Sequence, residues 1–247
     1  MEIHKDITIL FDVDGTLTYP MKEIEPSMID ALEKIRGKGY NLSVVGGSDY
    51  NKIYKQLKSS IELFDYICSE NGLVLHSRDK QNIFSMSIRD KIGELQFDIL
   101  IKEITNKLEK ISLPIKRDNF IEIRKACINV SPIGRSCSYE ERRDFYEYDK
   151  IHKIRENLIN DLSSILKEND LIAVIGGMIS IDIYPIGWDK SYCLKFFENS
   201  EIIHFFGDKT EEGGNDYAIY NDKRVIGHSV LDPNDLINQL SLLEPNR

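Results

Sequence analysis

Cysteine is scarce in this sequence, and no two cysteines have a short spacing. The 247 residues contain four cysteines and no Cys-x-x-Cys motif, so we expect neither a disulfide scaffold nor a zinc site. Scattered thiols are typical of cytosolic proteins, and the acidic residues within 1–6 do not resemble a signal peptide. We therefore predict a cytoplasmic protein.

Long apolar runs and an excess of positive charge are also missing. The apolar runs are far too short to span a bilayer, and the formal net charge at pH 7 is -9. This charge disfavours nucleic acid and anionic membranes as main partners. Neither a Walker A nor a Gly-x-Gly-x-x-Gly sequence occurs, which disfavours nucleotide binding of those two kinds. An anionic small substrate stays compatible with the sequence, because the local charge around a site matters more than the total.

The most informative segment that is present is DVDGT at residues 12–16. It follows an apolar and β-branched run at 7–11, which predicts a buried strand. Two carboxylates at the end of such a strand predict a nucleophile at Asp12, a proton-transfer group at Asp14 and oxygen ligands for Mg²⁺. The alternative is an ordinary turn, since Asp and Gly are common turn formers.

Strand and helix patterns alternate at both ends of the chain but not in its middle. Residues 1–85 and 187–247 predict β-α-β units, and therefore an α/β core with a Rossmann-like parallel sheet. Residues 86–186 predict a helix at 90–109, two short strands, a long charged helix at 139–168 and a hairpin. We interpret this middle segment as an inserted α+β domain.

Polar residues follow the predicted strands of the core, at Asp12, Asp14, Ser48, Lys190 and Asp208. In a parallel sheet, ligands bind beyond the carboxyl ends of the strands. Mg²⁺ held by Asp12, Asp208 and an oxygen near Asp14 would offset the repulsion between a carboxylate nucleophile and a phosphate dianion. Ser48 would donate to phosphate oxygens, and Lys190 would add a fixed positive charge. Each also has an ordinary interpretation: a helix cap for Ser48, a turn for Asp208 and a surface position for Lys190.

Several segments resemble known families. Those that resemble the motifs of the haloacid dehalogenase superfamily are DVDGT at 12–16, GGSD at 46–49, GWDK at 187–190, and GDKT at 207–210 with GGND at 213–216. Those that resemble the eukaryotic-type α-phosphomannomutase family are FIEIR at 120–124, NVSPIGRSC at 129–137 and GGMISID at 176–182. The likeness extends over nearly the whole chain.

The resemblance implies a catalytic core at 1–85 and 187–247 and a mobile C2b-type cap at 86–186, which sets substrate specificity and joins a homodimer. It implies that Asp12 carries phosphate as an aspartyl-phosphate and that Asp14 is the general acid and base. Such an isomerase interconverts mannose 6-phosphate and mannose 1-phosphate for GDP-mannose synthesis. The reaction passes through a hexose 1,6-bisphosphate, which also serves as activator. The alternative is a sugar-phosphate phosphatase, a hydrolase that would share every core residue.

The resemblance also assigns substrate contacts to the cap. The arginines that would hold the distal phosphate are Arg124, Arg135 and Arg142, and the sugar contacts are Ser180 and Asp182. Guanidinium groups suit this role because they bind phosphate oxygens in a bidentate way. The alternative is that these arginines form surface ion pairs with Glu122, Glu140 or Glu141, since exposed ion pairs are common.

Two further features concern the core. The resemblance implies a second cation where Tyr220 and Asp222 match the family. One position departs from the family pattern, because Met21 stands where the family has a substrate-contacting arginine, with Lys22 beside it. Lys22 is the candidate replacement, but lysine offers a point charge in place of a planar fork. The departure bears on substrate affinity or choice.

Overall fold

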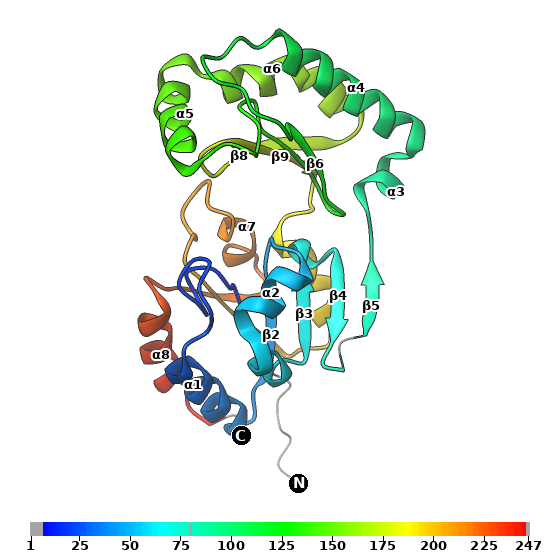
Figure 1. The fold of residues 1–247 in the computed structure, drawn as a ribbon. Coiled ribbons are helices and arrows are strands. Elements are labelled where there is room, and N and C mark those ends of the chain that lie inside the picture. Colours follow the sequence, from blue (N-terminus) through cyan, green and yellow to red (C-terminus); the bar gives the residue numbers. More distant parts are fainter. Residues whose placement is uncertain (1–6, 80, 246–247) are drawn as a thin grey trace. The chain divides into compact units, whose positions relative to one another are not determined.

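Figure 1 shows the computed structural model of the protein, which describes residues 7–79 and 81–245. The chain divides into two compact units. Unit 1 comprises the residues up to Ser85 and from Gly187 onward, and unit 2 comprises Met86–Ile186. The predicted lack of a signal peptide concerns residues 1–6, which lie outside the described residues. Within those residues, no helix combines the length and the apolar composition that crossing a membrane requires.

Unit 1 contains a seven-stranded sheet with the order β11-β10-β1-β2-β3-β4-β5. Its strands are β1 (Ile7–Phe11), β2 (Asn41–Val45), β3 (Tyr66–Ser69), β4 (Val74–Ser77), β5 (Asn82–Ser85), β10 (Ile202–Gly207) and β11 (Ile226–Ser229). The five strands from β11 to β3 pair in parallel, which confirms the predicted α/β fold. The edge differs, because β3, β4 and β5 pair antiparallel. Only the short 3-10 turn η2 (Glu70–Gly72) and Leu73 separate β3 from β4, and a parallel crossover needs a longer connection.

Helices cover both faces of this sheet. One apolar cluster joins the sheet to α1 (Pro26–Gly37), α2 (Tyr50–Leu57), the 3-10 helix η1 (Lys58–Leu63) and α8 (Pro233–Ser241). A second cluster joins it to the 3-10 helix η3 (Lys190–Phe197) and α7 (Tyr217–Tyr220). Ile9 and Phe11 of β1 belong to the first cluster and Leu10 to the second, as the alternation of strand side chains requires. Figure 1 shows α1 and α8 side by side, and the two helices are in contact.

Unit 2 contains a four-stranded antiparallel sheet with the order β6-β7-β9-β8. Its strands are β6 (Ile121–Ile123), β7 (Ile128–Val130), β8 (Leu171–Gly176) and β9 (Ser180–Pro185), and its helices are α3 (Ile88–Ile92), α4 (Glu94–Lys110), α5 (Tyr139–His152) and α6 (Ile154–Glu168). α6 contacts both β8 and α4. Ile128, Val130, Ile181 and Ile183 are buried, so the sheet has one apolar face and carries polar residues on the other.

Two helices predicted in unit 2 are each broken in two. The helix predicted at 90–109 is interrupted at Gly93, whose φ of 84° separates α3 from α4. The helix predicted at 139–168 is interrupted at Lys153, whose φ of 54° separates α5 from α6. After this break the N–H of Arg155 donates to Oδ1 of Asp149 over 2.9 Å. A lysine in the left-handed region is uncommon and leaves no signal in the sequence.

Candidate active site

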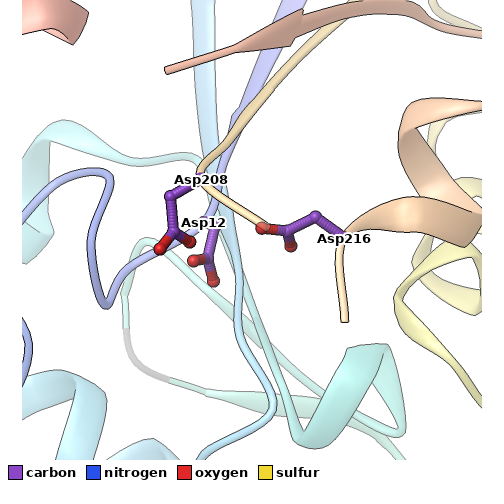
Figure 2. Close-up of side chains that lie close together, drawn as sticks. All are labelled: Asp12, Asp208 and Asp216. Carbon is purple, nitrogen blue, oxygen red and sulfur yellow. The ribbon is translucent and has the colours of Figure 1, made fainter. Parts of the chain in front are cut away.

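The carboxyl ends of β1 and β10 lie next to each other and carry the central acidic residues. Asp12 follows β1, and its N–H donates to the carbonyl oxygen of Phe206 in β10 over 2.9 Å. Asp208 follows β10, and Asp216 is the residue before α7. Figure 2 shows the three side chains, and one carboxylate oxygen from each lies within 4.8 Å of the others. The structure thus brings the predicted Asp12 and Asp208 together with Asp216.

Lys190 is the cation of this acidic cluster. Its Nζ lies 2.5 Å from Oδ1 of Asp12 and 2.5 Å from Oδ1 of Asp216, and its side chain is 1% exposed. This burial excludes the surface interpretation of Lys190. Burial alone would lower the pKa of Lys190, but Asp12 and Asp216 outweigh it and raise the pKa. Lys190 therefore stays protonated at neutral pH.

The cluster holds more negative charge than Lys190 balances. Burial and the neighbouring carboxylate of Asp216 raise the pKa of Asp12 to about 7, although Lys190 lowers it. Burial also raises the pKa of Asp208, and its Oδ1 is a buried oxygen that accepts no hydrogen bond in the described part of the chain. Leaving a buried carboxylate oxygen without a donor is costly. These oxygens are the donor type that Mg²⁺ prefers, so the residues fit a divalent cation.

Gly15 allows the loop after β1 to approach the cluster. Its φ is 92°, and a Cβ built at this position would lie 2.3 Å from Oδ2 of Asp208. Any side chain here would be strained and would displace the Asp208 carboxylate. The glycine of the DVDGT segment is therefore required by the backbone conformation and by the space next to Asp208.

The carboxylate of Asp14 contacts a different set of residues. Its Oδ1 accepts hydrogen bonds from the N–H of Met21 over 2.8 Å and from Nε2 of Gln56 over 2.7 Å. Its Oδ2 accepts one from Nζ of Lys52 over 2.9 Å. Burial would raise the pKa of Asp14, but the donors Met21, Lys52 and Gln56 outweigh it and lower the pKa. An ionised Asp14 can accept a proton. The predicted contact between Asp14 and a metal ion stays a prediction.

A pocket of about 120 Å³ adjoins these residues. Its lining consists of Asp12, Val13, Asp14, Gly46, Gly47, Ser48, Ile53, Lys209 and Asn215. The hydroxyl of Ser48 accepts a hydrogen bond from Nζ of Lys52 over 3.0 Å. The cap of α2 is Asp49, whose side chain accepts from the N–H of Lys52, so the capping interpretation of Ser48 is wrong. Ser48 instead lies in a pocket with both aspartates of the DVDGT segment.

Three residues of this site are not among the predicted site residues: Asp216, Lys52 and Gln56. Asp216 ends the GGND segment at 213–216, which marks it as the second acid after β10. Lys52 and Gln56 lie four residues apart in α2, and this spacing places two side chains on one helix face. No sequence pattern indicates that this face meets Asp14.

Met21, which stands where the family has an arginine, contacts Asp14 through its backbone. Met21 is 81% exposed and has a φ of 62°. Its N–H contacts Asp14, as described above, while its side chain lies in solvent. Lys22 is exposed beside it. A substrate contact by Lys22 stays a prediction.

The two residues expected at a second cation, Tyr220 and Asp222, lie in different surroundings. Tyr220 is the last residue of α7 and is half-buried. The carboxylate of Asp222 accepts hydrogen bonds from Nε and Nη2 of Arg224 over 2.8 and 2.7 Å. Arg224 lowers the pKa of Asp222. Because a guanidinium already occupies both oxygens, a cation here would compete with Arg224, and the second cation stays a prediction.

The predicted substrate residues of unit 2 lie around the polar face of its sheet. The strand register places Glu122, Asn129 and Asp182 in one row across β6, β7 and β9. Nε of Arg124 lies 2.7 Å from Oε1 of Glu122, and Nε of Arg135 lies 2.5 Å from Oε2. The ion pairs with Glu122 that the sequence left as an alternative are therefore present, and one carboxylate orients both arginines.

Arg142 and Ser180 are held by main-chain groups. Nη2 of Arg142 donates to the carbonyl oxygen of Arg135 over 2.9 Å, which places the two arginines together. The hydroxyl of Ser180 donates to the carbonyl oxygen of Gly176 over 2.9 Å. Ser180 and Asp182 are two residues apart in β9, so they share one face of the strand.

Comparison with known proteins identifies similar sequences along most of the chain. A sequence model described as "Eukaryotic phosphomannomutase" matches residues 28–244. The phosphomannomutase of Triticum aestivum is 47% identical over 234 residues, which cover 94% of this chain and 93% of the relative. The phosphomannomutase of Arabidopsis thaliana is 46% identical over 238 residues, which cover 96% of both chains.

Comparison with solved structures identifies the fold. Aspergillus fumigatus trehalose-6-phosphate phosphatase matches with a TM-score of 0.61 at 14% identity, over 97% of this chain and 92% of the other. A haloacid dehalogenase-like hydrolase from Bacteroides thetaiotaomicron matches with a TM-score of 0.55 at 17% identity, over 87% and 85%. At these identities the similarity shows the haloacid dehalogenase fold alone, and the activity must come from the site and from the sequence relatives.

Proposed function

Because the chain belongs to the eukaryotic phosphomannomutase family, we propose that it is an isomerase that interconverts mannose 6-phosphate and mannose 1-phosphate. The observation that carries this proposal is 47% identity with a phosphomannomutase over 94% of the chain. This identity favours a mutase over a sugar-phosphate phosphatase. Its product, mannose 1-phosphate, would supply GDP-mannose synthesis.

Asp12 is the nucleophile in this proposal. One of its carboxylate oxygens forms a bond to phosphorus while the bond between phosphorus and the sugar oxygen breaks, which leaves the phosphoryl group on Asp12. The contact of 2.5 Å between Asp12 and Nζ of Lys190 supports this role. The ammonium offsets the buried negative charge beside the attacking oxygen, and it remains at hand as charge develops in the transition state.

Asp14 moves the proton on the sugar. It protonates the sugar oxygen that leaves phosphorus, and in the opposite direction it removes a proton from the sugar hydroxyl that attacks the aspartyl-phosphate. Its lowered pKa and its contacts with Lys52 and Gln56 support the ionised form, which acts as the base. The proton that it takes from the attacking hydroxyl is the one that it returns to a leaving sugar oxygen. A hexose 1,6-bisphosphate would first load Asp12. Transfer from Asp12 to a monophosphate then regenerates a bisphosphate, which can return its other phosphoryl group.

The residues that would hold Mg²⁺ are Asp12, Asp208 and Asp216 together with an oxygen near Asp14. The ion would supply positive charge beside the transferring phosphoryl group. The buried Oδ1 of Asp208, which accepts no hydrogen bond in the described part of the chain, supports this assignment. Ser48, on the wall of the same pocket as Asp12, would donate to the phosphate.

The polar face of unit 2 would bind the rest of the substrate. Arg124, Arg135 and Arg142 would hold the phosphate that is not being transferred, and Ser180 and Asp182 would contact the sugar hydroxyls. Support comes from the shared orientation of Arg124 and Arg135 by Glu122. Lys22 would add a point charge in place of the family arginine.

The assembly and the location are further parts of the proposal. We expect a homodimer joined through unit 2, a second cation near Tyr220 and Asp222, and a cytoplasmic protein. The four cysteines, all within the described residues, form no disulfide, which fits a reducing compartment.

One assay tests the mutase against the phosphatase. The protein is incubated with Mg²⁺ and mannose 1-phosphate, with and without a hexose 1,6-bisphosphate, and both mannose 6-phosphate and free phosphate are measured. A mutase forms mannose 6-phosphate in a reaction that depends on the bisphosphate. Release of mainly free phosphate would identify a hydrolase.

Alanine in place of Arg135 is expected to weaken the binding of a phosphorylated sugar far more than the cleavage of a small aryl phosphate. The only phosphate of an aryl phosphate is the group transferred to Asp12, so none is left for the arginine to hold. Mannose 1-phosphate keeps its own phosphate while it accepts the phosphoryl group from Asp12, and a charge-assisted hydrogen bond to that phosphate contributes about 1.5–3 kcal/mol. We therefore expect KM for mannose 1-phosphate to rise about 10–100-fold. Steady-state kinetics with both substrates provide the measurement, and equal losses on both would contradict the distal-phosphate role.

A further inference from the structure

Asn129 lies at the centre of the polar face of unit 2, and neither the family motifs nor the predicted site explains its role. It is the middle residue of β7, where it pairs in register with Glu122 of β6 and Asp182 of β9. Its neighbours Ile128 and Val130 are buried on the opposite face, as the alternation of side chains requires. Asn129 itself is 2% exposed. A buried amide is costly unless both of its polar atoms find partners.

Both polar atoms of Asn129 contact predicted substrate residues. Nδ2 donates a hydrogen bond to Oδ1 of Asp182 over 2.6 Å, and Oδ1 accepts one from Nη1 of Arg135. A guanidinium can only donate, and an ionised carboxylate can only accept. The two partners therefore fix the orientation of the amide. Asn129 is the neutral group between a cation predicted to bind phosphate and an anion predicted to bind the sugar.

The amide also completes the orientation of Arg135. Nε of this guanidinium is already fixed by Glu122 at 2.5 Å, and Nη1 is fixed by Asn129. Two anchored nitrogens of a rigid planar group determine the direction of the third, Nη2. Without the amide, Arg135 and Asp182 could pair directly, since arginine and carboxylate readily form bidentate pairs. Such a pair would use the same atoms that the two residues would offer to a substrate.

We propose that Asn129 is a positioning residue that keeps Arg135 and Asp182 apart and orients both toward a phosphorylated sugar. This inference rests on the proposed function, because it takes distal-phosphate binding by Arg135 as its premise. Asparagine suits the position because it is donor and acceptor at once. Leucine, of similar size, would leave both partners without their hydrogen bonds.

The test compares Asn129→Leu with the parent chain in the bisphosphate-dependent conversion of mannose 1-phosphate. We expect KM to rise at least about tenfold, because both Arg135 and Asp182 lose a hydrogen bond, while kcat stays nearly unchanged. Hydrolysis of a small aryl phosphate should also stay unchanged. Val130→Ala is the matched control, since Val130 is the next residue and is buried on the other face. It should lower the melting temperature and leave KM as it is.

A double-mutant cycle separates positioning from a general structural effect. In the Arg135→Ala background the part of the KM penalty that acts through the guanidinium should disappear, because the group that Asn129 orients is gone, and only the part that acts through Asp182 should remain. Should Asn129→Leu fail to fold, Asn129→Asp keeps the size and the acceptor for Arg135 but places a carboxylate against Asp182. That variant should raise KM at least as much.

An unchanged KM in Asn129→Leu or Asn129→Asp, a penalty that persists in full without Arg135, or equal losses on both substrates would overturn the inference. The activity of the parent chain is the control for the proposed function, which is the premise of the inference. A parent without bisphosphate-dependent conversion would refute the proposed function and the inference with it. A parent that converts the sugar beside a variant of unchanged KM would refute the inference alone.

Discussion

Replacement of Asp12 by asparagine is expected to abolish turnover, with a fall in kcat of at least about 10⁴-fold, as for other lost nucleophiles. An amide cannot attack phosphorus to form the covalent intermediate. The fold should remain, because asparagine has the same size and Lys190 keeps its contact of 2.5 Å with Asp216. Steady-state rates with mannose 1-phosphate and circular dichroism of the same sample provide the measurement.

Asp14→Asn is the matched control for this prediction. It carries the same chemical change two residues away but retains the carboxylate of Asp12. With an aryl phosphate, whose leaving group needs little protonation, this variant should still transfer phosphate to Asp12. With the sugar phosphate it should lose about 10²–10⁴-fold, the usual contribution of a general acid or base. Near-normal activity of Asp12→Asn would refute the nucleophile assignment.

Lys190→Met is expected to cost both stability and activity. It removes the cation between two buried carboxylates, and breaking a buried ion pair typically costs about 3–5 kcal/mol. The loss of a fixed charge beside the transferring phosphoryl group should lower kcat by about 10²–10³-fold. The pKa of Asp12, already raised to about 7 by burial despite Lys190, should rise further without the ammonium. Urea denaturation and steady-state kinetics measure the two effects.

Two further variants make the lysine prediction specific. Lys195→Met changes another lysine of η3, whose Nζ lies over the rings of Tyr192 and Phe84 at 3.8 and 4.0 Å, and it should leave activity nearly unchanged. Adding Asp216→Asn to Lys190→Met removes one uncompensated carboxylate. It should recover part of the stability and none of the activity. A Lys190→Met protein as stable and active as the parent would contradict the role of Lys190.

The sequence predicts the core of the fold well because local patterns and topology agree there. Each residue of the run at 7–11 is either β-branched or apolar, and all five are buried as β1. The polar residues that end the parallel strands meet at one edge of the sheet, which is why Asp12 and Asp208 converge. Their meeting follows from strand direction and requires no side-chain detail.

Other features depend on contacts that no local pattern encodes. Lys153 adopts a left-handed conformation between α5 and α6, although lysine is usually a good helix former. The turn at η2 makes β4 antiparallel although the preceding units are parallel. Lys52 and Gln56 contact Asp14 only because α2 packs beside the loop after β1. Tertiary packing decides these three features.

Asp216 and Asn129 are intermediate between the features that local patterns predict and those that tertiary packing decides. Each stands in a segment that the sequence distinguishes, GGND at 213–216 and NVSPIGRSC at 129–137. The segments indicate that the residues matter but do not say what they touch. The structure supplies the partners, Lys190 for Asp216 and Arg135 with Asp182 for Asn129.

The central claim is that Asp12 carries the phosphoryl group during turnover, and trapping that adduct tests it most directly. The protein is mixed briefly with a hexose 1,6-bisphosphate and Mg²⁺, quenched in acid and treated with borohydride, which reduces an aspartyl-phosphate to homoserine. Peptide mass spectrometry then locates the modified residue. We predict homoserine at position 12, absent when the bisphosphate is omitted. A modified residue elsewhere, or no covalent adduct in a protein that is turning over, would contradict the account.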